Sequence, residues 1–341
     1  MFNLKLRIPF LLLLLGLLFS LAQPTYEKPA IAGVQKPQAA AANDQRAREA
    51  KENVLLQQYV DVSLSDTSTR RKFFTDLSGA DRSYLWRVHL SFHIASHPEL
   101  SAEQSQFVLD ALAVATPELF SLRNDDPSWR AKVAEPLNNL KDRALQLFSK
   151  EQAGEILANL GGGPDEIDYL RQYLSLAPLD RSARKSFFSN ASALQKSKIW
   201  QAHLAMNLAR RTELNARQRA VIKEALARVT PELYETPKND ASWSTKVDEP
   251  IRLFAKRALA VFGKEEGAMI FSELGGSSPT LHHARTTLPA CDCSHESDWC
   301  VYDCWSSNCT SSTWGCGTFG VYACNGLCYW PPMGDGPTRG L

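Results

Sequence analysis

The first 290 residues of this 341-residue chain contain no cysteine, and no second long apolar run follows the one that ends near residue 21. Histidine is scarce, with seven residues, and 38 Lys and Arg balance 37 Asp and Glu. A balanced charge gives no basic footprint for DNA or RNA, so we expect no nucleic-acid partner. The sequence also lacks a Ser-His-Asp set, an HExxH motif and a glycine-rich phosphate loop. It therefore predicts neither an enzyme nor a bound cofactor or metal.

The N-terminus has the pattern of an export signal. Lys5 and Arg7 precede a leucine-rich run, and the small residues Ser20 and Ala22 stand just before Gln23. This predicts a secretory signal peptide over 1–22, cut after Ala22, and a secreted protein in an extracellular or periplasmic location. The apolar run is shorter than the roughly 20 residues of a membrane span, which disfavours a retained anchor.

The next residues, 23–43, are rich in Pro and Ala and predict a flexible linker before the first folded part. After them the chain repeats itself. A shift of 114 residues superposes 59–162 on 173–276 without a gap, and about 40 of roughly 104 positions are identical. The sequence predicts a mostly α fold with two tandem homologous helical bundles, repeat 1 over 44–162 and repeat 2 over 163–276, and about five helices in each.

Shared residues of the two repeats mark helix ends. Ser101 with Gln104, and Asn215 with Gln218, predict equivalent helix starts closed by capping boxes. Pro136 and Pro250 predict a kink or a restart of a later helix in each copy. Alternating apolar and polar residues, which would indicate strands, are absent from both repeats.

Three histidines spaced four residues apart, His89, His93 and His97, would share one helix face and suggest a metal site. The duplication argues against it, because only His89 has a histidine counterpart, His203. We therefore expect one partly buried structural histidine and two surface ones.

Four tryptophans recur at equivalent positions of the two repeats: Trp86, Trp129, Trp200 and Trp243. They are interpreted as core residues, because each ring buries a large apolar area. The alternative is that they line a ligand groove.

A polar linker, 277–290, leads to a third part, 291–341, which holds every cysteine of the chain. An even number of cysteines in a short exported segment predicts four disulfides, although eight cysteines allow 105 pairings. Zinc is the rival explanation and is disfavoured, since the spacing lacks companion histidines. The predicted disulfide residues are Cys291, Cys293, Cys300, Cys304, Cys309, Cys316, Cys324 and Cys328.

This cysteine-rich tail is also rich in aromatic residues. A segment this small cannot bury all of them, so we expect some to contact a target-cell membrane or a surface receptor. The alternative is that they cover the disulfides. Because the tail is acidic, electrostatic attraction to anionic lipid is excluded as the main force. The predicted contact residues are Trp299, Trp305, Trp314, Tyr322 and Trp330.

The tail carries a distinctive pattern: C-x-C-S from Cys291, then S-D-x-C from Ser297, then GCG from Gly315 and VYACNG from Val321. In these residues it resembles the bacteriocin fulvocin C-related protein family. The resemblance covers about 40 residues and implies an antimicrobial, disulfide-bonded peptide behind a signal peptide and a helical region.

Two functions are therefore expected. In the first, the chain is a bacteriocin-like precursor, the helical repeats are a carrier or pro-region, and a processing protease frees the tail at Arg285 or at the run Leu288-Pro289-Ala290. In the second, it is an extracellular binding or adhesion protein with a duplicated helical module and a disulfide cap. Oxidised tail that inhibits related strains would favour the first, and an inert tail with a partner bound to the helical module the second.

Overall fold

The computed structural model describes residues 35–63, 65–123, 125–157, 164–176, 179, 181–275, 291–297, 299–300, 303–306 and 308–328. By compactness the chain divides into one unit of Met1–Ala50 and a second of Lys51–Leu341. In the first unit the described residues form the beginning of helix α1 (Gln35–Ser63). All other described elements belong to the second unit.

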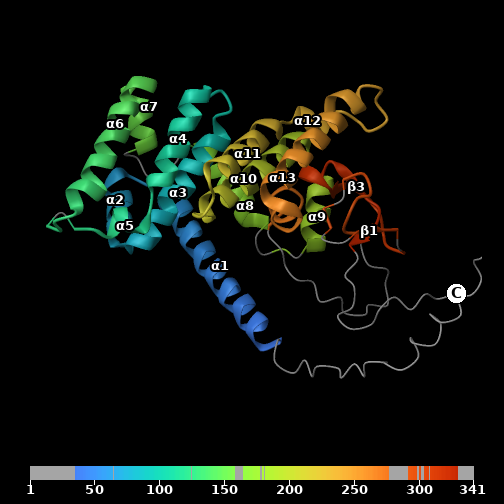
Figure 1. Ribbon diagram of the computed structural model, residues 1–341, viewed down its shortest axis with the longest axis horizontal. Coiled ribbons are helices and arrows are strands. Elements are labelled where there is room, and N and C mark those ends of the chain that lie inside the picture. The colour runs from blue at the N-terminus through green and yellow to red at the C-terminus, as the bar shows by residue number, and fades with distance from the viewer. Residues whose placement is uncertain are drawn as a thin grey trace, which may run out of the picture. The chain divides into compact units, whose positions relative to one another are not determined.

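The described residues are mostly helical, as predicted, with thirteen α-helices before the tail (Figure 1). After α1 come α2 (Thr67–Asp76), α3 (Gly79–Ser96), α4 (Ala102–Val114), α5 (Pro117–Ser121), α6 (Glu135–Leu147) and α7 (Lys150–Leu157). The remaining helices are α8 (Pro164–Leu176), α9 (Arg181–Asn190), α10 (Ala193–Arg210), α11 (Ala216–Arg228), α12 (Glu232–Glu235) and α13 (Glu249–Phe271).

Helix α1 begins inside the segment 23–43 that was predicted to be a flexible linker. The cause is local composition: four alanines, 39–42, are followed by the charged helix formers of the segment QRAREAKE. Alanine has the highest helix propensity of all residues, and straight-chain charged residues lose little freedom in a helix. Pro37 does not prevent this, because it lies in the first turn of α1, where a proline is tolerated.

Equivalent helices start at equivalent positions of the two repeats. Gly79 and Ala193, which begin α3 and α10, are 114 residues apart, and so are Ala102 and Ala216, which begin α4 and α11. Both predicted capping boxes are present: Ser101 closes with Gln104, and Asn215 with Gln218. Each box satisfies two backbone N–H groups that the first turn leaves without a helical partner.

The recurring prolines restart helices, as predicted, but each restart follows a wide turn. A π-helical turn, Arg130–Ala134 in repeat 1 and Ser244–Asp248 in repeat 2, runs directly into α6 and α13. Pro136 and Pro250 lie in the first turn of these helices, where a proline's missing N–H costs no hydrogen bond.

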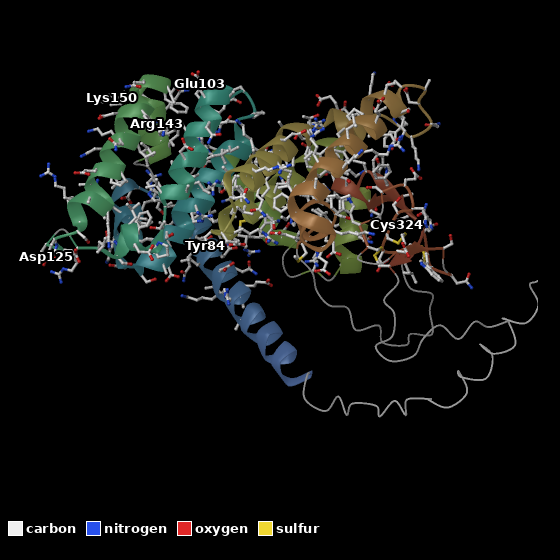
Figure 2. All side chains as sticks on the ribbon, in the orientation of Figure 1. Tyr84, Glu103, Asp125, Arg143, Lys150 and Cys324 are labelled. Carbon is white, nitrogen blue, oxygen red and sulfur yellow. A yellow bond between two sulfur atoms is a disulfide. The ribbon has the colours of Figure 1, made fainter. Side chains whose placement is uncertain are left out.

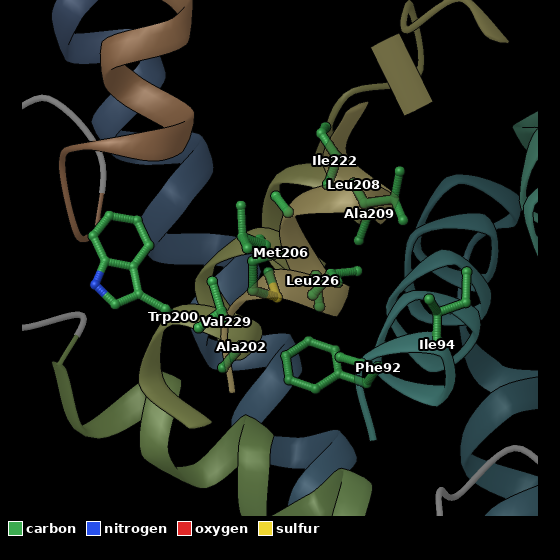
Figure 3. Packing of buried hydrophobic residues seen from close by; sticks show 14 of the residues in the cluster. Phe92, Ile94, Trp200, Ala202, Met206, Leu208, Ala209, Ile222, Leu226 and Val229 are labelled. Carbon is green, nitrogen blue, oxygen red and sulfur yellow. The ribbon is translucent and has the colours of Figure 1, made fainter. Parts of the chain in front are cut away.

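The core is centred on α3 and α10, which pack against each other (Figure 1). Figure 3 shows Phe92 of α3 near the apolar side chains of α10, among them Ala202 and Met206. Arg87 of α3 is buried between the two repeats. Its guanidinium donates to the carbonyl oxygens of Ala209 at 2.7 Å, Leu208 at 3.1 Å and Arg211 at 3.2 Å. A cation thus caps the C-terminal end of α10, where free carbonyls and the helix dipole favour positive charge.

The tail forms two small antiparallel sheets. One pairs β1 (Cys304–Trp305) with β4 (Leu327–Cys328), and the other pairs β2 (Ser312–Cys316) with β3 (Tyr322–Cys324). A 3₁₀ turn, Thr318–Gly320, connects β2 to β3. Strands this short cannot form a stable sheet alone, so crosslinks and packing must hold them.

Candidate functional site

All eight cysteines form disulfides, as predicted: Cys291–Cys309, Cys293–Cys304, Cys300–Cys328 and Cys316–Cys324. The four bonds indicate an oxidising environment. Sulfur atoms of Cys293, Cys300 and Cys304 lie close enough to suggest a metal cluster. Since each belongs to a disulfide, none is a thiolate, and a thiolate is the form of cysteine that binds a metal. Figure 2 shows the side chains of this segment, with Cys324 labelled.

The residues that carry the family resemblance shape the tail. Gly315 and Gly317 of the GCG motif have φ values of 104° and 67°, a region that favours glycine. Gly326 of the ACNG motif has no room for a side chain, because a Cβ there would lie 2.7 Å from the sulfur of Cys304. Asn325 accepts a hydrogen bond from the N–H of His295 at 3.0 Å. These motif residues therefore have structural roles within the stapled tail.

The turn between β2 and β3 inserts into repeat 2. Phe319 is fully buried, and its ring lies 5.1 Å from that of Phe254, 5.8 Å from that of Trp200 and 6.4 Å from that of Phe271, measured between centroids. Its φ of 54° is a left-handed conformation that non-glycine residues rarely adopt. Because aromatic packing in this nest stabilises the turn, the strained backbone persists.

Polar contacts fix the same docked position. The Tyr234 hydroxyl donates to the carbonyl oxygen of Phe319 at 3.1 Å, and the Tyr322 hydroxyl donates to Asp248 Oδ1 at 3.0 Å. Burial, together with the charge of Asp248, raises the pKa of Tyr322, so its hydroxyl remains a donor at physiological pH. The Lys185 ammonium donates to the carbonyl oxygen of Cys291 at 3.2 Å. The tail is therefore attached to repeat 2 by both apolar and polar contacts.

The five aromatic residues predicted to contact a membrane or partner are placed differently from one another. Trp299 and Tyr322 are buried against repeat 2, and Trp314 is half-buried there, with the Lys196 ammonium 4.8 Å from its ring centroid. Trp305 is 56% exposed. Trp330 lies outside the described residues. In the folded chain the body thus covers Trp299 and Tyr322, and contact of these two side chains with a membrane stays a prediction for a detached tail.

Both predicted processing positions, Ala22 and Arg285, lie outside the described residues. Within the residues that are described, no helix is long and apolar enough to cross a membrane.

A second group of polar residues is buried where α3 of repeat 1 meets α8, the first helix of repeat 2. His89 Nδ1 lies 3.1 Å from Oε2 of Glu166, and His93 Nδ1 lies 3.0 Å from Oε1 of the same carboxylate. The other nitrogen of His89, Nε2, lies 3.1 Å from the carbonyl oxygen of Glu155. His97 is half-buried, and its ring stacks on that of His93 with centroids 4.1 Å apart. We define His89, His93, His97 and Glu166 as the histidine cluster.

The expectation of two surface histidines is wrong for His93, which is 5% exposed. Glu166 is the residue that sequence reasoning missed. It lies 73 residues from His93 in the chain, at the start of α8, and the 114-residue shift places it opposite Glu52 of repeat 1. Its recurrence as Glu52 marks the position, but the sequence could not reveal the contact with His93, because that contact depends on how α8 packs against α3.

Charge differs between the equivalent histidines. Both nitrogens of His89 face oxygen acceptors, so both carry protons and the ring is an imidazolium. Burial is the largest single effect and lowers its pKa, but the charge and hydrogen bond of Glu166 and the backbone hydrogen bonds near Glu155 together outweigh it, so the net pKa is raised. Burial also opposes ionisation of Glu166, yet His89 and His93 outweigh it and lower the carboxyl pKa to about 2.

His203 occupies the equivalent place in repeat 2 without a carboxylate. Its Nδ1 accepts a hydrogen bond from the N–H of Gly275 at 3.2 Å, and its Nε2 lies 3.3 Å from the carbonyl oxygen of Met269. One nitrogen accepts and the other donates, as in a neutral imidazole. Burial lowers the pKa of His203 to about 4, which agrees with this geometry.

Comparison with known proteins adds no assignment: no family model, curated protein or solved structure matches this chain.

Proposed function

We propose that this chain is a secreted, bacteriocin-like precursor. Its two sequence repeats form two homologous helical bundles, and repeat 2 holds the disulfide-stapled antibacterial tail until a protease cuts the segment 277–290. The motif resemblance of the tail supports the activity, and the four disulfides support export to an oxidising compartment.

One observation carries the proposal. The tail's aromatic side chains Trp299, Phe319 and Tyr322 are buried against repeat 2. These are the groups with which an acidic peptide would contact a membrane or receptor, because it lacks a basic charge for lipid attraction. A carrier that covers them keeps the precursor inactive.

The test uses the full mature chain with a specific protease site placed in 277–290. We expect the uncut chain to be inert towards related strains, and the cut chain to inhibit them once the tail dissociates. Tyr322→Phe removes the hydrogen bond to Asp248 and should speed dissociation without loss of the ring. Reduction of the disulfides should abolish inhibition. A dissociated, oxidised tail that inhibits no strain would overturn the proposal.

A second candidate, an extracellular binding protein, is favoured by a difference between the repeats. Four aromatic residues that frame the tail's docking face in repeat 2 are buried: Phe188, Trp200, Tyr234 and Trp243. Their counterparts in repeat 1 are only partly buried: Phe74, Trp86, Phe120 and Trp129. No described part of the tail packs against these four, so repeat 1 presents an aromatic face of the same design.

The occupant of that face would be a protein segment with an aromatic side chain on a tight turn, as in the tail itself. Arg71 and Arg82 replace the tail-contacting cations Lys185 and Lys196, so positive charge is retained. The probe is the oxidised peptide 312–324, titrated onto the full chain. We expect Arg82→Glu to weaken binding about tenfold and Arg82→Lys to preserve it. Equal binding by a peptide with Phe319→Ala would refute this candidate.

A further inference from the structure

Two histidines and a buried carboxylate converge at the C-terminal end of α3. His93 lies in the last turn of this helix, His97 is the residue that follows it, and Glu166 reaches them from α8. One nitrogen of each histidine and one oxygen of Glu166 all lie within 4.8 Å of one another. Two imidazoles and one carboxylate are a donor set that Zn²⁺ prefers, with a fourth position left for water. We propose that His93, His97 and Glu166 form a binding site for a divalent transition-metal ion, Zn²⁺ above all.

The surroundings suit such an ion. Glu166 is 5% exposed, and a buried carboxylate favours positive charge beside it, to which a metal ion would add beyond the charge of His89. His89 donates to Oε2 and thereby orients the carboxylate, which leaves Oε1 directed towards His93. Partners of this kind, which hold a ligand from behind, are typical of metal sites. The C-terminal end of a helix adds further attraction for a cation.

Repeat 2 supports the need for positive charge at this place. His93 and His97 correspond to Asn207 and Arg211, and the Arg211 guanidinium forms an ion pair with Glu266 at 2.8 Å. The equivalent helix end therefore carries a permanent cation in repeat 2. In repeat 1 the two histidines replace it with groups that can bind one.

A modest adjustment would complete the site. Zinc lies about 2.0 to 2.2 Å from nitrogen and oxygen ligands, so donors around it are roughly 3.3 to 3.5 Å apart. Donors that now lie within 4.8 Å must approach by at most about 1.5 Å, which side-chain rotation can supply. His97 is half-buried at the rim of the cluster, so its ring is partly open to solvent.

The experiment measures zinc binding by the full mature chain. After dialysis against a chelator, ZnCl₂ is titrated by calorimetry, and thermal unfolding is followed with and without the ion. We expect one tight site and a raised Tm, because a ligand that binds only the folded state stabilises it. The double variant His93→Asn/His97→Arg carries the side chains of α10 and should fold. It should bind zinc at least 100-fold more weakly.

His295→Asn is the matched control, because this exposed tail histidine lies outside the cluster. It should bind zinc as the unaltered chain does. Two results would overturn the proposal: no zinc uptake by the unaltered chain, or equal uptake by the double variant. The second result would place the ion elsewhere in the chain.

Discussion

At the scale of single residues, duplication gives this protein matched pairs whose environments have diverged. His89 and His203 keep the same contact with a backbone carbonyl, yet the first is charged and the second is neutral. The orientation of the neighbouring tryptophan ring differs with the charge of the histidine. The Trp86 ring lies parallel to His89, at an interplanar angle of 20°, whereas Trp200 meets His203 edge-on at 88°. A parallel ring suits a cation, since its electron-rich face points at the charge.

Stability should depend on pH through His203. Burial lowers its pKa to about 4, and in the unfolded chain it titrates near 6.5. Between these values the unfolded chain binds more protons, so stability falls as pH decreases from about 6.5 to about 4. The nearby cations Arg184 and Arg210 act in the same direction. We expect His203→Gln to lessen this pH-dependent loss by about 2 to 3 kcal/mol, measured by urea unfolding across the range. Parallel curves for both proteins would contradict it.

Substitution of the buried Arg87 should lower the stability of the protein, because this side chain joins the two repeats. Replacing it with glutamine, the residue at the equivalent position 201, removes a buried cation that holds the end of α10. Hydrogen bonds to charged groups contribute about 1.5 to 3 kcal/mol each, so we expect Arg87→Gln to cost roughly 2 to 4 kcal/mol of unfolding free energy. Arg217→Gln, at an exposed site of α11, should cost less than about 0.5 kcal/mol. Similar losses for both variants would show that the cap contributes nothing.

At the scale of elements, the internal repeat and the residues that start helices predicted much of the helical body. Capping boxes and prolines located the starts of α4, α11, α6 and α13, because these devices act within a few residues. Long-range packing was not predictable. The pairing of His93 with Glu166 and the insertion of the turn at Phe319 join segments far apart in the chain, and no local signal encodes them. The predicted disulfide count was right, while the pairing required the structure.

The turn at Phe319 should dominate the attachment of the tail. Removal of a fully buried phenylalanine ring costs about 3 to 5 kcal/mol, so Phe319→Ala should loosen the tail even though its four disulfides remain intact. Limited proteolysis should then cut the segment 277–290 or the tail faster than in the unaltered chain. Trp305→Ala, at a side chain that is 56% exposed, is the control and should change little. Unchanged proteolysis of the Phe319 variant would argue that the polar contacts alone hold the tail.

At the scale of the whole molecule, the tail completes the core of repeat 2. Trp299, Phe319, Val321 and Tyr322 belong to the same apolar cluster as the helices. Sequence boundaries at 276 and 291 separate cysteine-free from cysteine-rich composition, but packing crosses them. Cysteine content predicts that disulfides stabilise a segment, but it does not predict which other part of the chain that segment packs against.

Reduction should therefore affect one half of the helical body more than the other. Each disulfide contributes about 2 to 4 kcal/mol to the tail, so a reducing agent should unfold it and uncover the faces of α9, α12 and α13. Hydrogen exchange followed by mass spectrometry should show faster exchange in these helices and unchanged exchange in α4 and α6. A uniform increase along the chain would contradict this expectation, and no increase in α9, α12 and α13 would do so as well.

The turn at Phe319 is synthesised after the helices into which it inserts. The ribosome makes both helical repeats before it makes Phe319, so the aromatic nest around Trp200 stays open to solvent until the final residues emerge. Closing it requires the tail to have formed its crosslinks, which happens only after the chain has reached an oxidising compartment. Completion of repeat 2 thus depends on oxidation of the tail. A chain whose tail is not oxidised keeps the aromatic side chains of this nest exposed to solvent.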